Sequence, residues 1–162
     1  DLNAVSPPKI HQLGNAYVGI TGWTVFNTLL PYYTAKLPNP PTLDNETHIF
    51  EFFLGLWKAL RADYHVVNDQ PDTEDAPFAD LDSCFLIVTA GRIFRVASDL
   101  TVKRMERFAA IGCGDQYALG ALSVLYEQEI SAKELATRAV ETAAFWDSKC
   151  DLPVLAFECA GA

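Results

Sequence analysis

The sequence has no apolar run of membrane-spanning length and no signal-peptide pattern at its start, so neither a membrane anchor nor a secretory leader is expected. Basic residues are few: 12 Lys and Arg against 21 Asp and Glu give a formal net charge of -9, which argues against nucleic acid as a partner. Repeats and low-complexity tracts are also absent. The 50% hydrophobic content is typical of a globular protein, and we expect a single domain spanning residues 1–162.

The cysteines form no CxxC pair and no Cys/His cluster with zinc spacing, which excludes the common structural metal sites. They are Cys84, Cys113, Cys150 and Cys159. We expect reduced thiols in a cytoplasmic protein, with Cys84 and Cys159 in core strands. The histidines show no pairing pattern and receive no role; they are His11, His48 and His65. The sequence gives no reason to expect an organic cofactor.

Strand-like and helix-like segments come in separate runs, which favours an α+β layout over a doubly wound parallel sheet. A strand is predicted over residues 15–21, followed by a helix over 23–35 that Pro31 should kink or shorten. A strong amphipathic helix comes next. Its apolar stripe is Ile49, Phe52, Phe53, Leu56, Trp57 and Leu60, and its candidate N-caps are Asp44, Asn45 and Thr47.

Residues 68–82 are acidic and contain two prolines, so this stretch is predicted to be a loop insertion. Two strands should follow, over residues 83–89 and 92–98. The Ala90-Gly91 pair between them suits a tight hairpin turn.

The last third of the chain is predicted to form a short strand, two helices and a closing strand. The short strand covers residues 108–111 and precedes a helix that begins near Asp115. Ser131 and Glu134 form a capping box that opens a second helix, which runs to about Asp147. The closing strand is expected over residues 152–158.

Three stretches, in this order, resemble the proteasome-β/HslV family of N-terminal-nucleophile (Ntn) hydrolases. The first is PKIHQL at residues 8–13 followed by VGITG at 18–22, which is similar to a family lysine passage and glycine turn. The second is AAIGCGDQYALGAL at residues 109–122, and the third is SAKELATRAVETAAFWDSKCD at 131–151. The resemblance covers nearly the whole chain.

The resemblance implies a four-layer α/β/β/α sandwich whose first hairpin is absent from this chain. In the family that hairpin begins with the threonine nucleophile. Asp1 cannot take this role, because a carboxylate has no hydroxyl group to acylate. The opening Asp1-Leu2-Asn3 is interpreted as the inside of a longer sequence or as a processed end. We therefore expect about two further strands, starting with Thr, Ser or Cys, ahead of Asp1.

Lys9 and Gly22 match two supporting positions of the family site. A positive charge at Lys9 would stabilise the developing alkoxide of the nucleophile, whereas the alternative is an ordinary solvated lysine. Gly22 ends a strand where the family places an oxyanion-hole N–H, and the alternative is a simple turn. Trp23 replaces a second small residue of the family pattern and reduces the free space there.

Cys113 and Cys150 stand where the family has hydroxyl residues, and Asp147 matches an aspartate that orients the terminal amine. A thiol is the weaker hydrogen-bonding group. Cys113 is therefore either a redox-responsive or nucleophilic thiol near a helix start, or a small residue of a tight turn. The resemblance also implies a monovalent cation held by backbone carbonyls at Ala144, Asp147 and Cys150.

The leading hypothesis is a threonine-type (Ntn) endopeptidase subunit that hydrolyses peptide bonds inside a self-compartmentalised ring. The first alternative is a non-catalytic structural ring subunit, favoured by the missing nucleophile, Trp23 and the two cysteines. The second is a thiol-based enzyme or redox sensor that uses Cys113 and Cys150. The implied partners are unfolded protein or peptide substrates, identical subunits of a ring and an ATPase unfoldase, with no nucleic acid and no membrane.

Overall fold

The computed structural model describes residues 8–64 and 80–159, and these residues build an antiparallel sheet with helices on both sides. The sheet has five strands, and each strand pairs with the next one along the chain. The strands are β1 (Ile10–Leu13), β2 (Ala16–Gly22), β3 (Ser83–Thr89), β4 (Arg92–Val96) and β5 (Val102–Met105). Strands and helices come in separate runs, which confirms the predicted α+β class.

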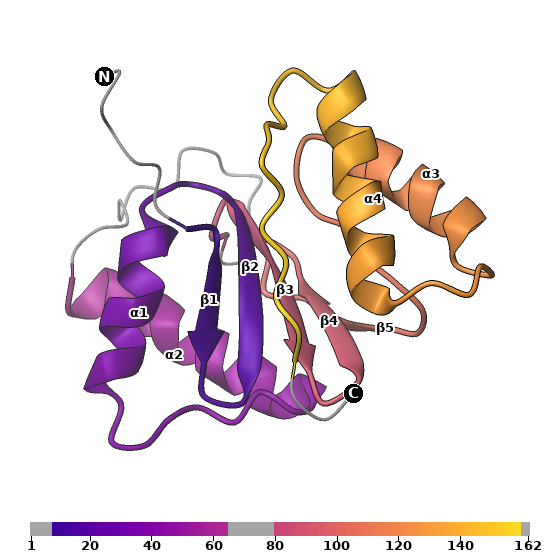
Figure 1. Ribbon diagram of the computed structural model, residues 1–162. Helices are drawn as coiled ribbons and strands as arrows, with labels where there is room; N and C mark the ends of the chain where they lie inside the picture. The colour runs from indigo at the N-terminus through magenta and orange to yellow at the C-terminus, as the bar shows by residue number, and fades with distance from the viewer. Residues whose placement is uncertain (1–7, 65–79, 160–162) are drawn as a thin grey trace.

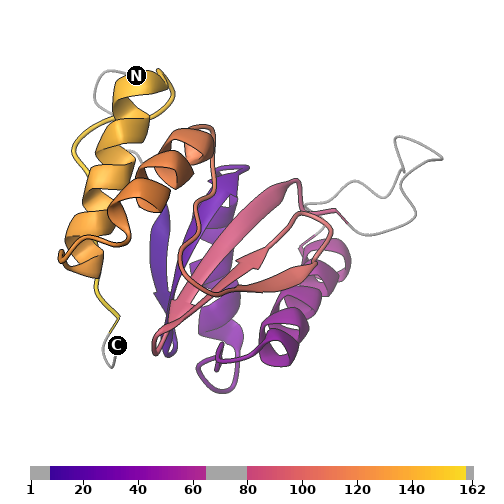
Figure 2. The same cartoon turned by 90° about the vertical axis from the view of Figure 1, so that its right-hand side faces the viewer.

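The helices are divided between the two sides of this sheet (Figure 1, Figure 2). The helices α1 (Phe26–Lys36) and α2 (Glu46–Ala62) cover one face. The helices α3 (Asp115–Leu125) and α4 (Ala132–Trp146) pack against each other on the opposite side. None of the helices within the described ranges combines the length and apolarity needed to cross a lipid bilayer.

The main core fills the space between the sheet and the helices α1 and α2. Alternate side chains of β3 point into it, so that Phe85 and Ile87 are fully buried while their neighbours are only half-buried. The apolar stripe of α2 meets them there, with the Phe53 and Phe85 ring centroids 4.6 Å apart. Truncation of one such ring to alanine typically costs about 3–5 kcal/mol, so this contact is a principal source of stability.

Local sequence signals correctly predicted one hairpin turn and the N-caps of two helices. Ala90 and Gly91 both have positive φ, 37° and 73°, as a two-residue hairpin turn of type I′ requires. Asn45, one of three candidates, caps α2 by accepting the His48 backbone N–H at 2.9 Å. Ser131 caps α4 by accepting the Glu134 backbone N–H at 3.1 Å.

The start of the chain differs from the prediction in two ways. Residues 10–13 form strand β1, which had not been predicted and which pairs with β2 through a turn at Gly14 and Asn15. The predicted helix over 23–35 begins only at Phe26, because residues 23–25 form turns whose carbonyls accept the first helical N–H groups. Pro31 does not end this helix, which continues to Lys36.

Two predicted strands in the second half were wrong. Residues 108–111 are irregular, and the strand that pairs with β4 is β5, because a turn at Leu100 (φ 67°) reverses the chain earlier. Residues 152–158 are extended but belong to no strand, so the expectation that Cys159 lies in a strand also fails. This segment crosses the side of the sheet that faces α3 and α4 (Figure 1), and Pro153 has no N–H for a ladder.

The sheet face towards α3 and α4 is only partly covered. Its residues Tyr17, Leu86 and Val88 are half-buried, and Phe157 stacks on Tyr17 with 5.6 Å between ring centroids. The small core of α3 and α4 is a separate cluster that shares no buried residue with the main core. The predicted loop over 68–82 lies outside the described residues except for its last three positions.

Candidate functional site

Four chain segments meet at one end of the molecule, the upper end in Figure 1. They are the start of β1, the end of β2, the start of α3 and the end of α4. All five residues that the sequence predicts to support catalysis belong to these segments, namely Lys9, Gly22, Cys113, Asp147 and Cys150.

Gly22 ends β2 in a conformation that excludes any side chain. Its φ is +109°, and a Cβ atom there would lie 2.5 Å from Ser83 Oγ and 2.6 Å from the Asp82 carbonyl oxygen. The next amide, that of Trp23, already donates to Ser83 Oγ at 2.9 Å. Glycine therefore allows β2 and β3 to approach closely at the point where the sequence predicts an oxyanion-stabilising N–H.

The turn of Gly112, Cys113 and Gly114 lies against the end of β2. Gly112 has φ +111°, and a Cβ atom there would stand 3.5 Å from Thr21 Oγ1. Gly114 precedes the first residue of α3, and the Cys113 side chain is exposed. Cys113 therefore directly follows Gly112, the residue that lies beside the end of β2.

The end of α4 contacts the same glycine turn. A Cβ atom on Gly114 would lie 2.7 Å from Cys150 Sγ and 2.9 Å from Ala143 Cβ, so only glycine fits without a shift. Asp147 builds the turn that carries Cys150: its Oδ1 accepts the Lys149 N–H at 2.8 Å, and its carbonyl accepts the Cys150 N–H at 3.0 Å. The Asp147 carboxylate therefore stabilises the backbone turn that Asp147 itself begins.

Lys9 joins this region through its backbone. Its carbonyl oxygen accepts the Ile20 N–H at 2.9 Å, which extends the pairing of β1 and β2 by one residue. Its side chain is exposed. Because β2 separates β1 from β3 in the sheet, Lys9 lies on one side of the β2 end and Ser83 on the other.

Sequence reasoning missed the residues that hold this end together. Thr21, Asp82 and Ser83 contact the glycine turns or Trp23. Thr21 lies within the VGITG stretch but was assigned no role, and no motif marks Asp82 and Ser83. They could be found only from the register, which pairs Gly22 with Ser83 and Thr21 with Cys84. The histidines with described side chains lie elsewhere: His48 Nδ1 is 2.6 Å from Asp44 Oδ1, and His11 Nε2 is 3.4 Å from Asn27 Oδ1.

The backbone turn after α4 is compatible with the cation that the resemblance implies. A helix C-terminus presents carbonyl oxygens with partial negative charge, and a carbonyl that accepts one N–H retains a second lone pair. Such a cation would be held by the carbonyls of Ala144, Asp147 and Cys150. Among the described residues, no group of three or more His, Cys, Asp or Glu side chains could hold a metal ion.

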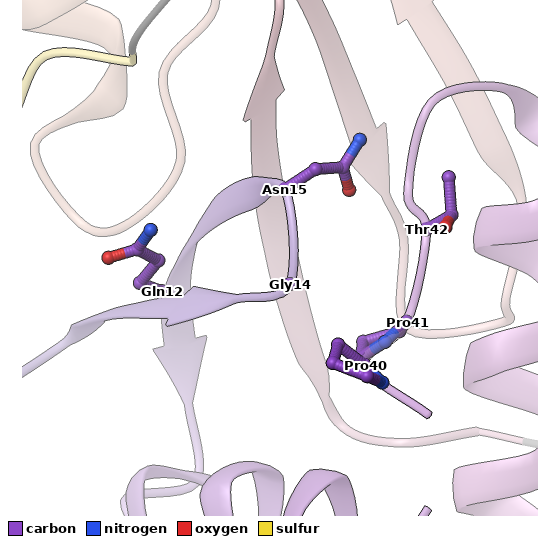
Figure 3. Close-up of a pocket in the computed structure, with 6 residues that line it drawn as sticks. All are labelled: Gln12, Gly14, Asn15, Pro40, Pro41 and Thr42. Carbon is purple, nitrogen blue, oxygen red and sulfur yellow. The ribbon is translucent and has the colours of Figure 1, made fainter. Parts of the chain in front are cut away.

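A shallow pocket lies at the opposite end of β1 and β2, beside the turn that joins them. Its lining comes from Gln12 of β1, from Gly14 and Asn15 of the turn, and from the connector between α1 and α2 (Figure 3). The connector residues are Pro40, Pro41 and Thr42. The Asn15 side chain accepts the Leu43 N–H at 2.9 Å, so this contact holds the connector to the sheet. We assign the pocket a structural role.

No family model and no curated protein matches the chain. Among solved structures, it is similar to Thiobacillus denitrificans BPH in complex with epoxomicin, with 34% identity over 93% of this chain and 78% of that one, and a TM-score of 0.83. A second structure of the same BPH gives 33% identity, a TM-score of 0.82, and coverage of 92% and 77%.

Two more distant structures share the fold. HslV from Trypanosoma brucei has 18% identity over 88% of this chain and 75% of that one, with a TM-score of 0.59. Anbu (ancestral beta-subunit) from Yersinia bercovieri has 16% identity over 93% and 71%, with a TM-score of 0.56. Together these matches confirm the Ntn-type, proteasome-like fold that the sequence resemblance implied.

Proposed function

The chain belongs to the proteasome-like family that includes Thiobacillus denitrificans BPH, and from this premise we propose that it is most of a threonine-type endopeptidase subunit. The observation that carries the proposal is the meeting of Gly22, the turn of Gly112–Gly114 and Cys150 at one end of the molecule. These segments come from three distant parts of the sequence. They are also the segments in which the family resemblance places its supporting site.

The proposed reaction is hydrolysis of a peptide bond by a hydroxyl group at the processed N-terminus of the native protein. That oxygen attacks the scissile carbonyl carbon while its proton passes to the free α-amino group, whose ordinary pKa is near neutral. The carbon–nitrogen bond then breaks, the amine leaves with the proton, and water hydrolyses the ester. Lys9 stabilises the alkoxide, and the Gly22 N–H stabilises the oxyanion.

The strands that carry the nucleophile are proposed to precede Asp1. The sheet face towards α3 and α4 supports this part of the proposal, because Leu86, Val88 and Tyr17 remain half-buried there. The two core clusters share no buried residue. A second sheet between them would bury both apolar surfaces, as a layered α+β architecture requires.

We propose that Cys113 and Cys150 replace hydroxyl residues of the family without acting as nucleophiles. Asp147 keeps its role of holding the turn after α4. The cation at the carbonyls of Ala144, Asp147 and Cys150 is part of the same proposal. When bound, it would supply positive charge and rigidity to this turn.

Two alternatives remain open, and each has an observation in its favour. The exposed indole of Trp23, where the family pattern has a small residue, favours a non-catalytic ring subunit. The exposed side chain of Cys113 favours a thiol-based enzyme or redox sensor.

We further propose that the subunit forms a homo-oligomeric ring that receives unfolded protein from an ATPase unfoldase in the cytoplasm. The family membership supports the assembly. The four cysteines are all unpaired, as is usual in a reducing compartment, and this supports the location.

The deciding experiment uses the protein at its native length, as produced from its gene. Mass spectrometry of the mature N-terminus should find Thr, Ser or Cys, and fluorogenic peptides should be hydrolysed. An electrophilic inhibitor directed at threonine should label that residue, and epoxomicin should bind as it does to BPH. A mature protein that begins at Asp1, or a labelled Cys113, contradicts the proposal.

Lys9→Met provides the matched test of the supporting site. Loss of the charge should lower kcat by at least about 100-fold, a typical effect for one stabilising group in a catalytic site. The control is Lys58→Met, which removes another exposed lysine, from α2, and should leave kcat unchanged. Equal activity of the two variants would contradict the role of Lys9.

A further inference from the structure

Trp23 is fixed in place at the end of β2 by two hydrogen bonds. Its indole Nε1–H donates to Asp82 Oδ2 at 2.6 Å, and its backbone N–H donates to Ser83 Oγ at 2.9 Å. Gly22 precedes it in a conformation that no side chain could share. The indole is therefore positioned by the strand pairing at this end of the sheet.

The fixed indole is nevertheless largely exposed. The Trp23 side chain has a fractional exposure of 60% and makes no ring contact with another aromatic side chain among the described residues. A large ring held by hydrogen bonds loses little conformational entropy when a ligand stacks on it, so it is well suited to binding. It also directly follows Gly22, whose N–H is proposed to bind the scissile carbonyl.

The surroundings of this indole are acidic on the β3 side. Asp82 and Asp80 are both exposed, and the Asp82 N–H donates to Asp80 Oδ1 at 2.6 Å, which places the two residues side by side. Lys9 lies on the other side of β2. An indole that donates its N–H to a carboxylate carries more negative charge on its ring face, and that face attracts cations.

We propose that Trp23 is a specificity-determining residue that selects a cationic side chain, Arg or Lys, next to the scissile bond. The guanidinium or ammonium group stacks on the indole, while Asp82 and Asp80 provide the complementary charge. This inference rests on the proposed peptidase function, and it adds the substrate class. A bulky ring at this position thus replaces free space with a binding surface.

The test uses the native-length protein and fluorogenic peptides that differ only in one residue, Arg, Leu or Glu, on either side of the scissile bond. The wild type should favour Arg over Leu by about tenfold in kcat/KM, the order expected for one cation–π contact with added charge. Trp23→Ala should abolish this preference mainly through a higher KM for the Arg peptide. Asp82→Asn should reduce it, and Trp23→Phe should retain part of it.

The control is Trp146→Ala, which removes an indole of similar exposure, 65%, from α4. It should leave the Arg-to-Leu ratio unchanged. A wild type that prefers Leu or Glu, or a Trp23→Ala variant with an unaltered ratio, overturns the inference. Circular dichroism verifies folding, and Trp23→Phe with Asp82→Asn carries the test if the alanine variant does not fold.

A failure of the peptidase proposal would give a different result from a failure of the inference about Trp23. If no peptide is hydrolysed, the proposed function fails, and calorimetric binding of the Arg and Leu peptides then judges the inference. Tighter binding of the Arg peptide that is lost in Trp23→Ala supports the role of Trp23 as a cation-binding surface. Equal binding of the two peptides, or no binding, overturns it.

Discussion

Cys150 Sγ occupies the space next to Gly114, 2.7 Å from where a Cβ atom on that glycine would stand. The two residues are far apart in the sequence, yet this contact joins the start of α3 to the turn after α4. Gly114 has φ -90°, outside the left-handed region that favours glycine, so the requirement for glycine here is steric. The neighbouring Cys113 therefore depends on this packing for its position.

Gly114→Ala should destabilise the protein by about 1–3 kcal/mol, the usual cost of overpacking, because the new methyl group meets both Cys150 and Ala143. Thermal or denaturant unfolding measures the change. Gly120→Ala is the control: Gly120 lies inside α3, the helix that Gly114 precedes, with open space around its Cβ position, and the substitution should stabilise α3 by about 0.5–1 kcal/mol.

The contribution of the thiol to this cost can be separated in the double variant Gly114→Ala/Cys150→Ala. Removal of Sγ should recover part of the loss, because the closest of the two contacts is gone. A double variant whose two losses simply add would show that Cys150 does not occupy this space.

Gly14→Ala should be much more damaging than Gly91→Ala, although both glycines have positive φ, +57° and +73°. Each substitution strains the backbone by about 1–2 kcal/mol. Only at Gly14 would the methyl group also collide with another segment, 1.9 Å from the Pro41 carbonyl oxygen. Denaturant unfolding should therefore show an additional loss of at least about 1–3 kcal/mol at Gly14. Equal losses would mean that the connector does not pack on this turn.

Cys113→Ser tests the role of the exposed thiol. If the proposed hydroxyl mechanism holds, peptidase activity should be retained or raised, because serine is the stronger hydrogen-bonding group. Cys159→Ser, whose sulfur contacts the Val88 carbonyl away from this turn, serves as the control. Activity that disappears in Cys113→Ser alone would identify a thiol nucleophile, and the second alternative function would replace the first.

Asp99 should contribute to stability only above strongly acidic pH. The Thr101 backbone N–H donates to Asp99 Oδ1 at 2.9 Å, and this hydrogen bond, followed by that of the Thr101 side chain, lowers the pKa of the carboxyl group. Its stabilising contribution is then complete above the ordinary pKa of about 4 and is lost as the pH falls through the lowered value. The unfolding free energies of wild type and Asp99→Asn should converge in that range.

Asp44→Asn should behave in the same way, since the hydrogen bond with His48 lowers the pKa of Asp44. The two variants report on different parts of the fold, because Asp99 lies in the turn between β4 and β5 and Asp44 precedes α2. A difference from wild type that stays constant between pH 2 and pH 6 (roughly the range spanning the ordinary aspartate pKa) would contradict the assignment.

Local patterns predicted the elements whose signal lies within a few residues. The apolar stripe of α2, the caps at Asn45 and Ser131, and the hairpin turn at Ala90 and Gly91 all follow from short-range physics. The predictions for residues 108–111 and 152–158 failed because a strand exists only where a neighbour pairs with it. Apolar alternation cannot reveal where that neighbour lies.

The candidate site, too, was predicted in part from the sequence and explained in part only by the tertiary structure. The sequence, through its ordered resemblance, indicated Lys9, Gly22, Cys113, Asp147 and Cys150 as residues of one site. Only the tertiary structure showed that Gly22 is required by its approach to Ser83, that Gly114 is required by Cys150, and that Asp82 holds Trp23. Glycine, cysteine and tryptophan are compatible with many environments, and the contacts that select them come from segments that only the fold brings together.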